Sequence, residues 1–282
     1  MACFPPDVTF VTTKSGAPSL CERNFAASPC LKGISSDRII VQEGFSSAAL
    51  AYNDAIDRAQ TDLIVFAHQD VYFPDTWLGD LDRSLKILDS LDPDWGVLGG
   101  WGTGRGGFEA GFLYSVGLGL LGKPFERPVA VDTLDEFILV LRKSSGLRFD
   151  PALPHFHFYG MDICMSARKN KKRCYAISAL SVHNTSYGHL SPEFFSCYWP
   201  VKRKWREFLP VKTSCVTVSF WNTDLIVLRF KLICFALLAR DLIRPRLEDP
   251  RSALEFMAGA PDQGAEGQYH RALAGSTAGH KR

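Results

Sequence analysis

AYNDAIDRAQTDLIVFAHQDV, residues 51–71, places a helix, a strand and a polar triplet in direct succession. The run LIVFA at 63–67 is short and apolar, which predicts a buried strand. His68 and Asp70 follow it at once, where a strand that only fills a core usually ends in turn residues. The helix before the strand has an apolar face, made of Ala48, Ala51, Tyr52, Ala55, Ile56 and Ala59. The stretch therefore predicts polar chemistry at the end of a core strand.

The neighbouring segments predict a parallel sheet. Strands are expected at 8–13 and 38–44, and helices at 18–27 and 46–60. Alternating strands and helices favour right-handed crossovers between parallel strands, and such sheets bind ligands beyond the carboxyl ends of their strands. His68 and Asp70 fall at this edge. Further along we expect a helix at 75–88, a strand leading into a glycine-rich loop at 95–107, a strand at 135–143, a helix from about 160 and a strand at 174–184.

Composition restricts the class of protein. The 282 residues are 46% apolar and 22% charged, which is enough for one large domain, and a net charge of +2 is too small to indicate nucleic acid binding. Eight scattered cysteines without a CxxC pair argue against a zinc knuckle and fit the reduced thiols of a cytosolic protein. The N-terminus lacks the pattern of a signal peptide.

The chain divides into three parts. Residues 1–210 form the main domain, 211–245 are expected to be a helical segment, and 246–282 are small, polar and glycine-rich, which predicts a disordered tail. The apolar stretch at 225–245 is interrupted by Arg229 and Lys231, so it is not a membrane-spanning helix. It is either a helix packed on the domain or an amphipathic helix on a membrane surface.

Three acidic or imidazole side chains are candidates for chemistry. Asp70 is placed to hold a divalent cation, and its alternative role is to cap the turn before Pro74. His183 lies near the end of another predicted strand, where it is a second candidate ligand or a structural histidine. Asp162 begins a helix, so it is either a general base or an acidic residue favoured by the helix dipole.

The chain resembles a GT-A glycosyltransferase of the family 2 type over about residues 8 to 188, and it looks closest to a bacterial subgroup whose metal-binding triplet begins with His. The most specific part is the helix with Asn53, the apolar strand and the HQD triplet. The resemblance rests on these segments in this order: VTFVTT, RIIVQEG, AYNDAIDRAQTDLIVFAHQDV, WGVLGGWG, VDTLDEFILVLRK, LRFDPALPHFHFYGMDICMSA and VHNTSYG.

This resemblance implies an α/β, Rossmann-like domain with a mixed, mainly parallel sheet flanked by helices. It implies that Asp70 and His183 bind Mn²⁺ or Mg²⁺ and that Asp162 is the catalytic base, although Met161 stands where many relatives have Glu. The first triplet position contacts the nucleotide in that family, and here it is His68. The substrate-binding residues that the resemblance implies are Thr12, Glu43, Asn53, His68, Asp135 and Glu136.

The implied reaction moves a sugar from a nucleotide-sugar donor to a glycan or lipid-linked acceptor with inversion at the anomeric carbon. The enzyme would be cytoplasmic, with peripheral contact at the inner membrane face. Two alternatives remain open. A sugar-phosphate nucleotidyltransferase would need a glycine- and basic-rich loop after the first strand, of which TTKSGAPS at 12–19 is a thin version. A non-catalytic nucleotide- or glycan-binding module would keep the fold without the base.

Overall fold

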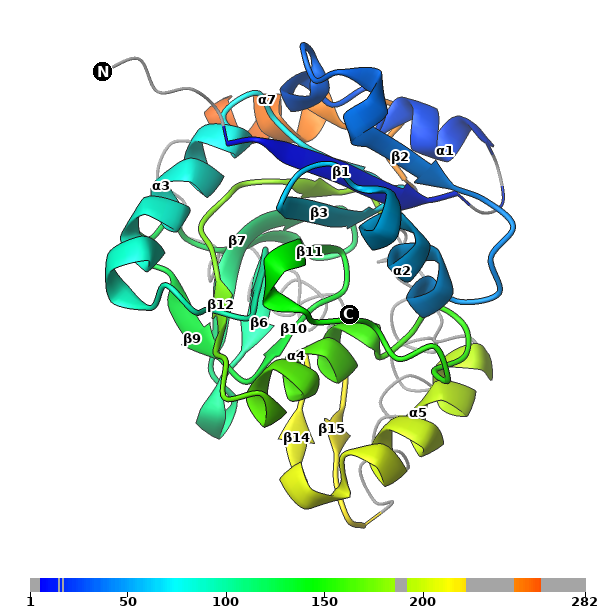
Figure 1. The fold of residues 1–282 in the computed structure, drawn as a ribbon. Helices are drawn as coiled ribbons and strands as arrows, with labels where there is room; N and C mark the ends of the chain where they lie inside the picture. The colour runs from blue at the N-terminus through cyan, green and yellow to red at the C-terminus, as the bar shows by residue number, and fades with distance from the viewer. Residues whose placement is uncertain (1–5, 15, 17, 186–191, 222–245, 260–282) are drawn as a thin grey trace, which may run out of the picture.

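A seven-stranded mixed sheet forms the centre of the molecule (Figure 1). The computed structural model describes residues 6–14, 16, 18–185, 192–221 and 246–259. The strand order is β2-β1-β3-β11-β5-β12-β9, in which β11 and β9 run antiparallel to the other five strands. The predicted mainly parallel sheet is thus confirmed. Its strands are β1 (Val8–Thr13), β2 (Ile39–Gln42), β3 (Leu63–His68), β5 (Val97–Gly99), β9 (Val129–Val131), β11 (Ile138–Arg142) and β12 (Cys174–Ala176).

A second sheet of six strands lies next to the carboxyl end of β3. It has the order β10-β6-β7-β13-β4, with β8 added to β7. The single strand predicted at 174–184 is therefore wrong, because the chain leaves the first sheet after β12 and enters the second as β13. The strands of this sheet are β4 (Val71–Tyr72), β6 (Trp101–Thr103), β7 (Glu109–Ser115), β8 (Gly119–Gly122), β10 (Thr133–Leu134) and β13 (Val182–His183).

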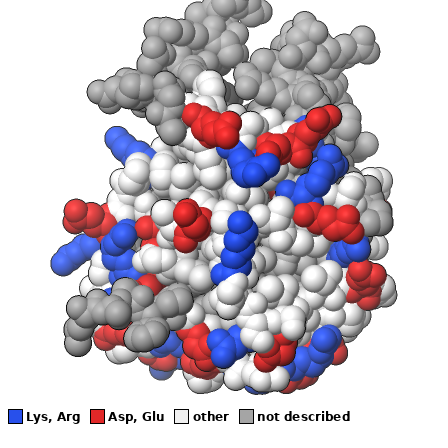
Figure 2. Space-filling view, turned by 90° about the horizontal axis from the view of Figure 1, so that it is seen from above, with Lys and Arg blue, Asp and Glu red and all other residues white. Residues whose placement is uncertain are grey.

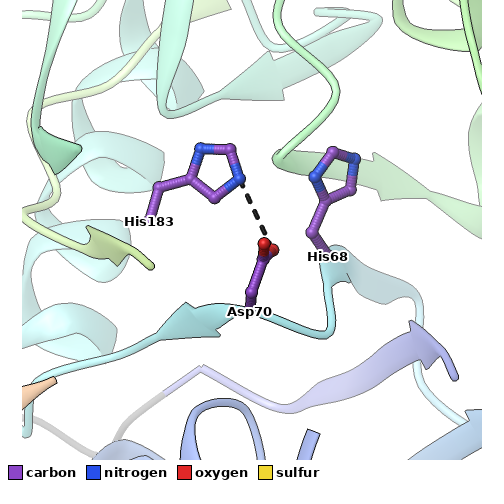
Figure 3. Close-up of side chains that lie close together, drawn as sticks. All are labelled: His68, Asp70 and His183. Carbon is purple, nitrogen blue, oxygen red and sulfur yellow. Dashed lines mark ion pairs between the residues drawn. The ribbon is translucent and has the colours of Figure 1, made fainter. Parts of the chain in front are cut away.

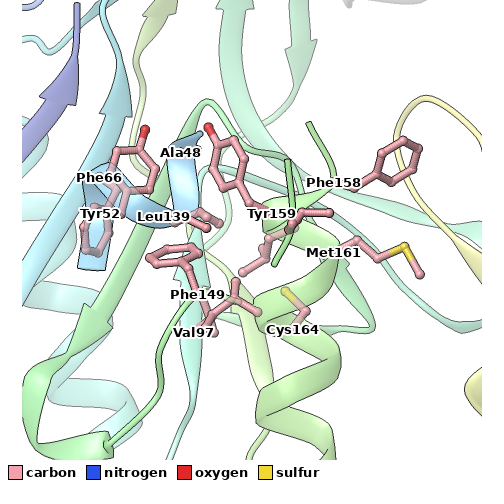
Figure 4. Close-up of a cluster of buried hydrophobic side chains, with 14 of the residues drawn as sticks. Ala48, Tyr52, Phe66, Val97, Leu139, Phe149, Phe158, Tyr159, Met161 and Cys164 are labelled. Atoms are coloured by element: carbon pink, nitrogen blue, oxygen red, sulfur yellow. The ribbon is translucent and has the colours of Figure 1, made fainter. Parts of the chain in front are cut away.

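Helices cover both faces of the first sheet. One core joins the sheet to α2 (Ala48–Arg58), α4 (Tyr159–Lys169) and α5 (Pro192–Lys204). The other core joins it to α1 (Pro18–Arg23) and α3 (Trp77–Leu91). The hydroxyl of Ser47 caps α2 by accepting the Leu50 N–H at 3.3 Å. Figure 4 shows aromatic rings of the first core, where Tyr52 packs on Phe66 with ring centres 4.7 Å apart.

Several glycines of the segment 95–107 are required by close packing. A Cβ atom on Gly100 would lie 2.6 Å from the Phe137 ring, and one on Gly102 would lie 2.8 Å from Val131. These separations are far shorter than a van der Waals contact. The segment runs through β5 and β6 into a 3-10 turn at Arg105–Gly107. Its glycines therefore let the chain cross between the two sheets.

The segment after 210 begins as a hairpin of β14 (Val211–Lys212) and β15 (Thr217–Val218). It is joined to the domain because Thr133 donates a hydrogen bond to the Lys212 carbonyl at 2.7 Å and Ser214 donates one to Asp135 at 2.6 Å. Residues 211–221 thus belong to the main domain rather than to a helical segment. The predicted helix at 225–245 lies outside the described residues.

The chain from 246 to 259 is ordered on the second sheet, so the disordered tail predicted from 246 is wrong for this part. Its helix α7 (Arg251–Gly259) buries Ala253 against Tyr72, Tyr114 and Val182. Apolar residues at 253, 254 and 257 share one helical face, but the polar, glycine-rich composition around them obscured this pattern. The remainder of the predicted tail, 260–282, lies outside the described residues.

Surface charge is mixed on the face that Figure 2 shows, where basic and acidic side chains are interspersed, in keeping with the net charge of +2. In the described part of the chain, every helix is too short or too polar to cross a membrane.

Candidate active site

Three side chains meet where the two sheets join. His68 is the last residue of β3, Asp70 lies in the turn before β4, and His183 ends β13. β13 pairs with β4 so that His183 lies opposite Val71, which brings it beside Asp70. One potential ligand atom from each residue lies within 4.8 Å of the other two (Figure 3). The fold thus unites the three residues, although 113 positions of sequence separate Asp70 from His183.

Asp70 is a buried carboxylate surrounded by cationic or polarisable groups. Its side chain is 10% exposed, with Oδ1 3.4 Å from Nε2 of His183 and Oδ2 3.9 Å from the guanidinium of Arg246. Burial raises the pKa of Asp70, but attraction to His183, His68 and Arg246 outweighs it and the net pKa is lowered. Asp70 is therefore ionised at neutral pH and attracts a cation.

The two imidazoles have opposite pKa shifts. Burial and the neighbouring His183 lower the pKa of His68 to about 4, so His68 is neutral at physiological pH. Burial also disfavours a charged His183, but Asp70 outweighs this and raises its pKa. The ring of Phe137 stacks on His183 at 5.3 Å and fixes its orientation.

Tyr159 holds the ring of His68 by a hydrogen bond. Its hydroxyl donates to the Glu136 carbonyl at 3.1 Å and lies 2.8 Å from Nε2 of His68. Nε2 of His68 is therefore engaged by Tyr159, and Nδ1 is the ring nitrogen left for another ligand. In Figure 3 one ring nitrogen of His68 faces Asp70 and the other faces away. This is how a second residue orients a metal-binding imidazole.

The donor set fits a divalent transition metal. Two imidazole nitrogens and one ionised carboxylate suit Mn²⁺ better than Mg²⁺, which prefers oxygen ligands alone. Among the described residues this is the one such cluster of three or more His, Cys, Asp or Glu side chains. Asp70 and His183 were expected here, and His68, expected at the nucleotide, joins them.

Asp162 occupies a closed environment in the first turn of α4. Its side chain is 1% exposed, and Oδ1 accepts hydrogen bonds from Nζ of Lys204 and the indole N–H of Trp205, both at 2.7 Å. Burial raises its pKa and the two donors lower it, with a net rise. The lysine pairs at the same time with Asp150 at 2.7 Å. The predicted base thus lies in an internal ion pair, and its catalytic role stays a prediction.

Asp135 and Glu136 lie in the turn between β10 and β11, close to the triad. Asp135 accepts hydrogen bonds from the Phe137 N–H at 3.2 Å and from Ser214. Glu136 accepts the Gly160 N–H at 3.2 Å. Burial, and next Asp135, raise the pKa of Glu136 to about 8. Both expected residues therefore lie near the candidate site.

The other expected substrate contacts have varied surroundings. Thr12 is fully buried in β1, and its hydroxyl has no hydrogen-bond partner among the described residues. Glu43 is 63% exposed and pairs with Lys14 at 3.4 Å. The Asn53 amide bonds both backbone groups of Phe149, at 2.8 and 3.1 Å, so it ties α2 to the segment before α4. The substrate contacts of these three residues remain predictions.

Tyr159 and Arg246 are site residues that sequence reasoning missed. Tyr159 is the first residue of α4, and nothing in its spacing indicates a bond to a histidine 91 positions away. Arg246 fell in the predicted tail. It is brought to Asp70 because Asn184, next to His183, bonds both backbone groups of Leu247 at 2.9 and 2.7 Å.

Comparisons with known proteins identify the fold but not the family. No family model matches the chain. A curated relative, "ATP synthase subunits region ORF 6" from Fuscovulum blasticum, is 27% identical over 174 residues, covering 59% of this chain and 69% of the relative.

Among solved structures, GalNAc-T7 with UDP, GalNAc and Mn²⁺ matches 70% of this chain with a TM-score of 0.50 and 9% identity. This chain spans about half of that protein, 48%. The mannosyltransferase PcManGT of Pyrobaculum calidifontis, in complex with GDP-Man and Mn²⁺, has a TM-score of 0.42 and 13% identity. The match covers 96% of this chain and 80% of the mannosyltransferase. The mixed sheet and its flanking helices confirm the expected GT-A fold.

Proposed function

We propose that this chain is a metal-dependent, inverting glycosyltransferase that moves a sugar from a nucleotide-sugar donor to a glycan or lipid-linked acceptor. The observation that supports the proposal most is the cluster of His68, Asp70 and His183 at the carboxyl edge of a GT-A sheet. In sheets of this kind the ligand binds at that edge. We place the chain nearest to family 2 enzymes with a His-first triplet.

The proposed chemistry assigns a task to each residue of the cluster. His68, Asp70 and His183 would hold Mn²⁺, which would stabilise the negative charge that develops on the departing nucleoside diphosphate. Tyr159 bonds Nε2 of His68, so Nδ1 would be the nitrogen that holds the metal. Arg246 is 45% exposed beside Asp70, where its guanidinium would contact a phosphate group. Attack by the acceptor from the face opposite the diphosphate gives inversion.

The proposed acceptor is associated with a membrane, as in polysaccharide synthesis at the inner face. Three large apolar side chains are exposed, Trp199 at 48%, Phe220 at 51% and Trp221 at 77%, and the last two come shortly before the apolar stretch 225–245 in the sequence. Lys202 lies over the Trp199 ring at 5.6 Å and donates to the Phe220 carbonyl at 3.0 Å. Aromatic side chains next to a cation are typical of surfaces that contact lipid headgroups.

Replacement of Asp70 tests the proposed function. We expect Asp70→Ala to remove Mn²⁺-dependent binding of UDP- and GDP-sugars and to lower transfer by at least about 100-fold. Isothermal titration calorimetry with and without Mn²⁺, and product analysis by mass spectrometry, give the two readouts. Asp75→Ala is the matched control, because Asp75 is an exposed carboxylate five residues further on. Equal donor affinity with and without Asp70 would disprove the metal assignment.

The same assay separates the alternatives. A nucleotidyltransferase would form a nucleotide sugar from a nucleoside triphosphate and a sugar phosphate. A non-catalytic module would bind the nucleotide sugar without releasing nucleoside diphosphate. Mn²⁺-dependent release of UDP or GDP together with a glycosylated acceptor supports the transferase.

A further inference from the structure

Glu136 is held at the rim of the metal cluster by the residue that follows it. The Phe137 ring stacks on His183, and its carbonyl accepts the His68 backbone N–H at 3.0 Å. Tyr159, which bonds His68, also donates to the Glu136 carbonyl. The backbone of Glu136 is thus fixed relative to both histidines. The start of the Glu136 side chain therefore has a fixed position relative to any ligand bound at His68 and His183.

Gly160 makes room for the Glu136 carboxylate at the start of α4. A Cβ atom on Gly160 would lie 2.8 Å from Cγ of Glu136 and 2.7 Å from the Leu134 carbonyl. Because that space is free, Oε1 of Glu136 accepts the Gly160 N–H at 3.2 Å. Any larger residue at 160 would have to displace Glu136 or the backbone of β10. The glycine and the glutamate therefore form one structural unit.

In the described part of the chain, Glu136 is not paired with a cation, whereas Asp162 is. Glu136 is half-buried, and among the described residues no Lys or Arg forms an ion pair with it. Asp162 is neutralised by Lys204 and closed to solvent. The shift of the Glu136 pKa to about 8, caused first by burial and then by Asp135, makes the ionised carboxylate a stronger base, although only a minority of Glu136 side chains are ionised at neutral pH. Backbone N–H groups of residues 158–160 oppose this shift.

We propose that Glu136 is the general base of the transfer, in an inference that rests on the proposed function. The acceptor O–H bond breaks and its proton passes to the Glu136 carboxylate. The acceptor oxygen forms a bond to the anomeric carbon, and the bond from that carbon to the diphosphate oxygen breaks with its electron pair. The nucleoside diphosphate leaves, and protonated Glu136 returns its proton to solvent.

Glu136→Gln is the decisive variant, because glutamine keeps an oxygen for the Gly160 N–H and so preserves the helix start. We expect a loss of about 10²- to 10⁴-fold in kcat for release of UDP or GDP from the UDP- or GDP-sugar that the wild type uses. Mn²⁺-dependent affinity for the same nucleotide sugar should be unchanged. Normal turnover by this variant, with normal donor binding, would disprove the base assignment while leaving the proposed function intact.

Addition of azide provides a second test, because azide would not restore turnover if Glu136 had only a structural role. Azide attacks without losing a proton, so Glu136→Ala should recover donor turnover when azide is added and should form a glycosyl azide of inverted configuration. No recovery in a variant that still binds the donor would count against Glu136. Asp162→Asn tests the competing assignment. If this variant binds the donor normally, loses turnover and recovers it with azide, Asp162 is the base. A wild type that binds donors with Mn²⁺ but never releases UDP or GDP would overturn both proposals.

Discussion

Two carboxylates lie at the start of α4, and the structure surrounds them in opposite ways. Asp162 points into the core, where Lys204 and Trp205 both donate to one of its oxygens. Glu136 reaches the helix from the β10–β11 turn, bonds a backbone N–H and remains partly open to solvent. The comparison teaches that an acidic residue at a helix start has no fixed role, because neighbouring side chains from other elements decide whether its charge is used for packing or for chemistry.

A large loss of stability should come from removing Lys204, the cation that pairs with Asp162. Lys204→Met leaves Asp162 buried without its cation, which should lower the free energy of unfolding by about 3 kcal/mol. Urea denaturation at neutral pH measures it. Lys169→Met is the control, because Lys169 and Glu207 are exposed and 4.0 Å apart, and such a pair contributes about 0–1 kcal/mol. Equal losses in the two variants would remove the contrast between the two carboxylates.

The second prediction concerns Gly160, where an added methyl group should displace the Glu136 side chain. Gly160→Ala places its Cβ against Glu136 and Leu134, so we expect a loss of about 1–3 kcal/mol in unfolding free energy. Donor turnover should fall with it while Mn²⁺ affinity is retained. Gly79→Ala in α3 is matched, because nothing lies within 4 Å of its Cβ position, and it should be neutral or stabilise by up to about 1 kcal/mol. Normal turnover in Gly160→Ala would show that the position of Glu136 does not matter.

A third effect is a pH dependence of stability assigned to Glu136. Its pKa is about 8 in the folded chain against an ordinary value of 4.5, so folded Glu136 keeps a proton that the unfolded chain releases. The free energy of unfolding of the wild type, minus that of Glu136→Gln, should be highest and constant below pH 4.5. It should fall as the pH rises toward 8 and stay constant above that pH. Denaturation of both proteins across this range, in chelator, measures the difference. A difference that does not change with pH would mean that Glu136 titrates normally.

The sequence predicted local features well and long-range pairings poorly. The end of β3 and the polar triplet after it were predictable, because an apolar run and the polar residues that follow it can be read from neighbouring positions in the sequence. The meeting of His183 with Asp70 was expected on the assumption of one sheet, whereas the structure achieves it through the second sheet. The hydrogen bonds between Lys204 and Asp162 and between Tyr159 and His68 depend on tertiary packing, which the spacing of residues in the sequence does not indicate. Helix α7 was missed because three apolar residues stand within a glycine-rich composition.

The contact between Arg246 and Asp70 has a thermodynamic consequence. Arg246 and a divalent cation are attracted to the same carboxylate, so each should weaken the binding of the other by an equal free energy. Arg246 is joined through Leu247 to Asn184 and through α7 to the second sheet. A cation bound at the candidate site and the attachment of residues 246–259 would therefore be reciprocally linked, and a bound diphosphate, which attracts both cations, would reverse the sign of that linkage.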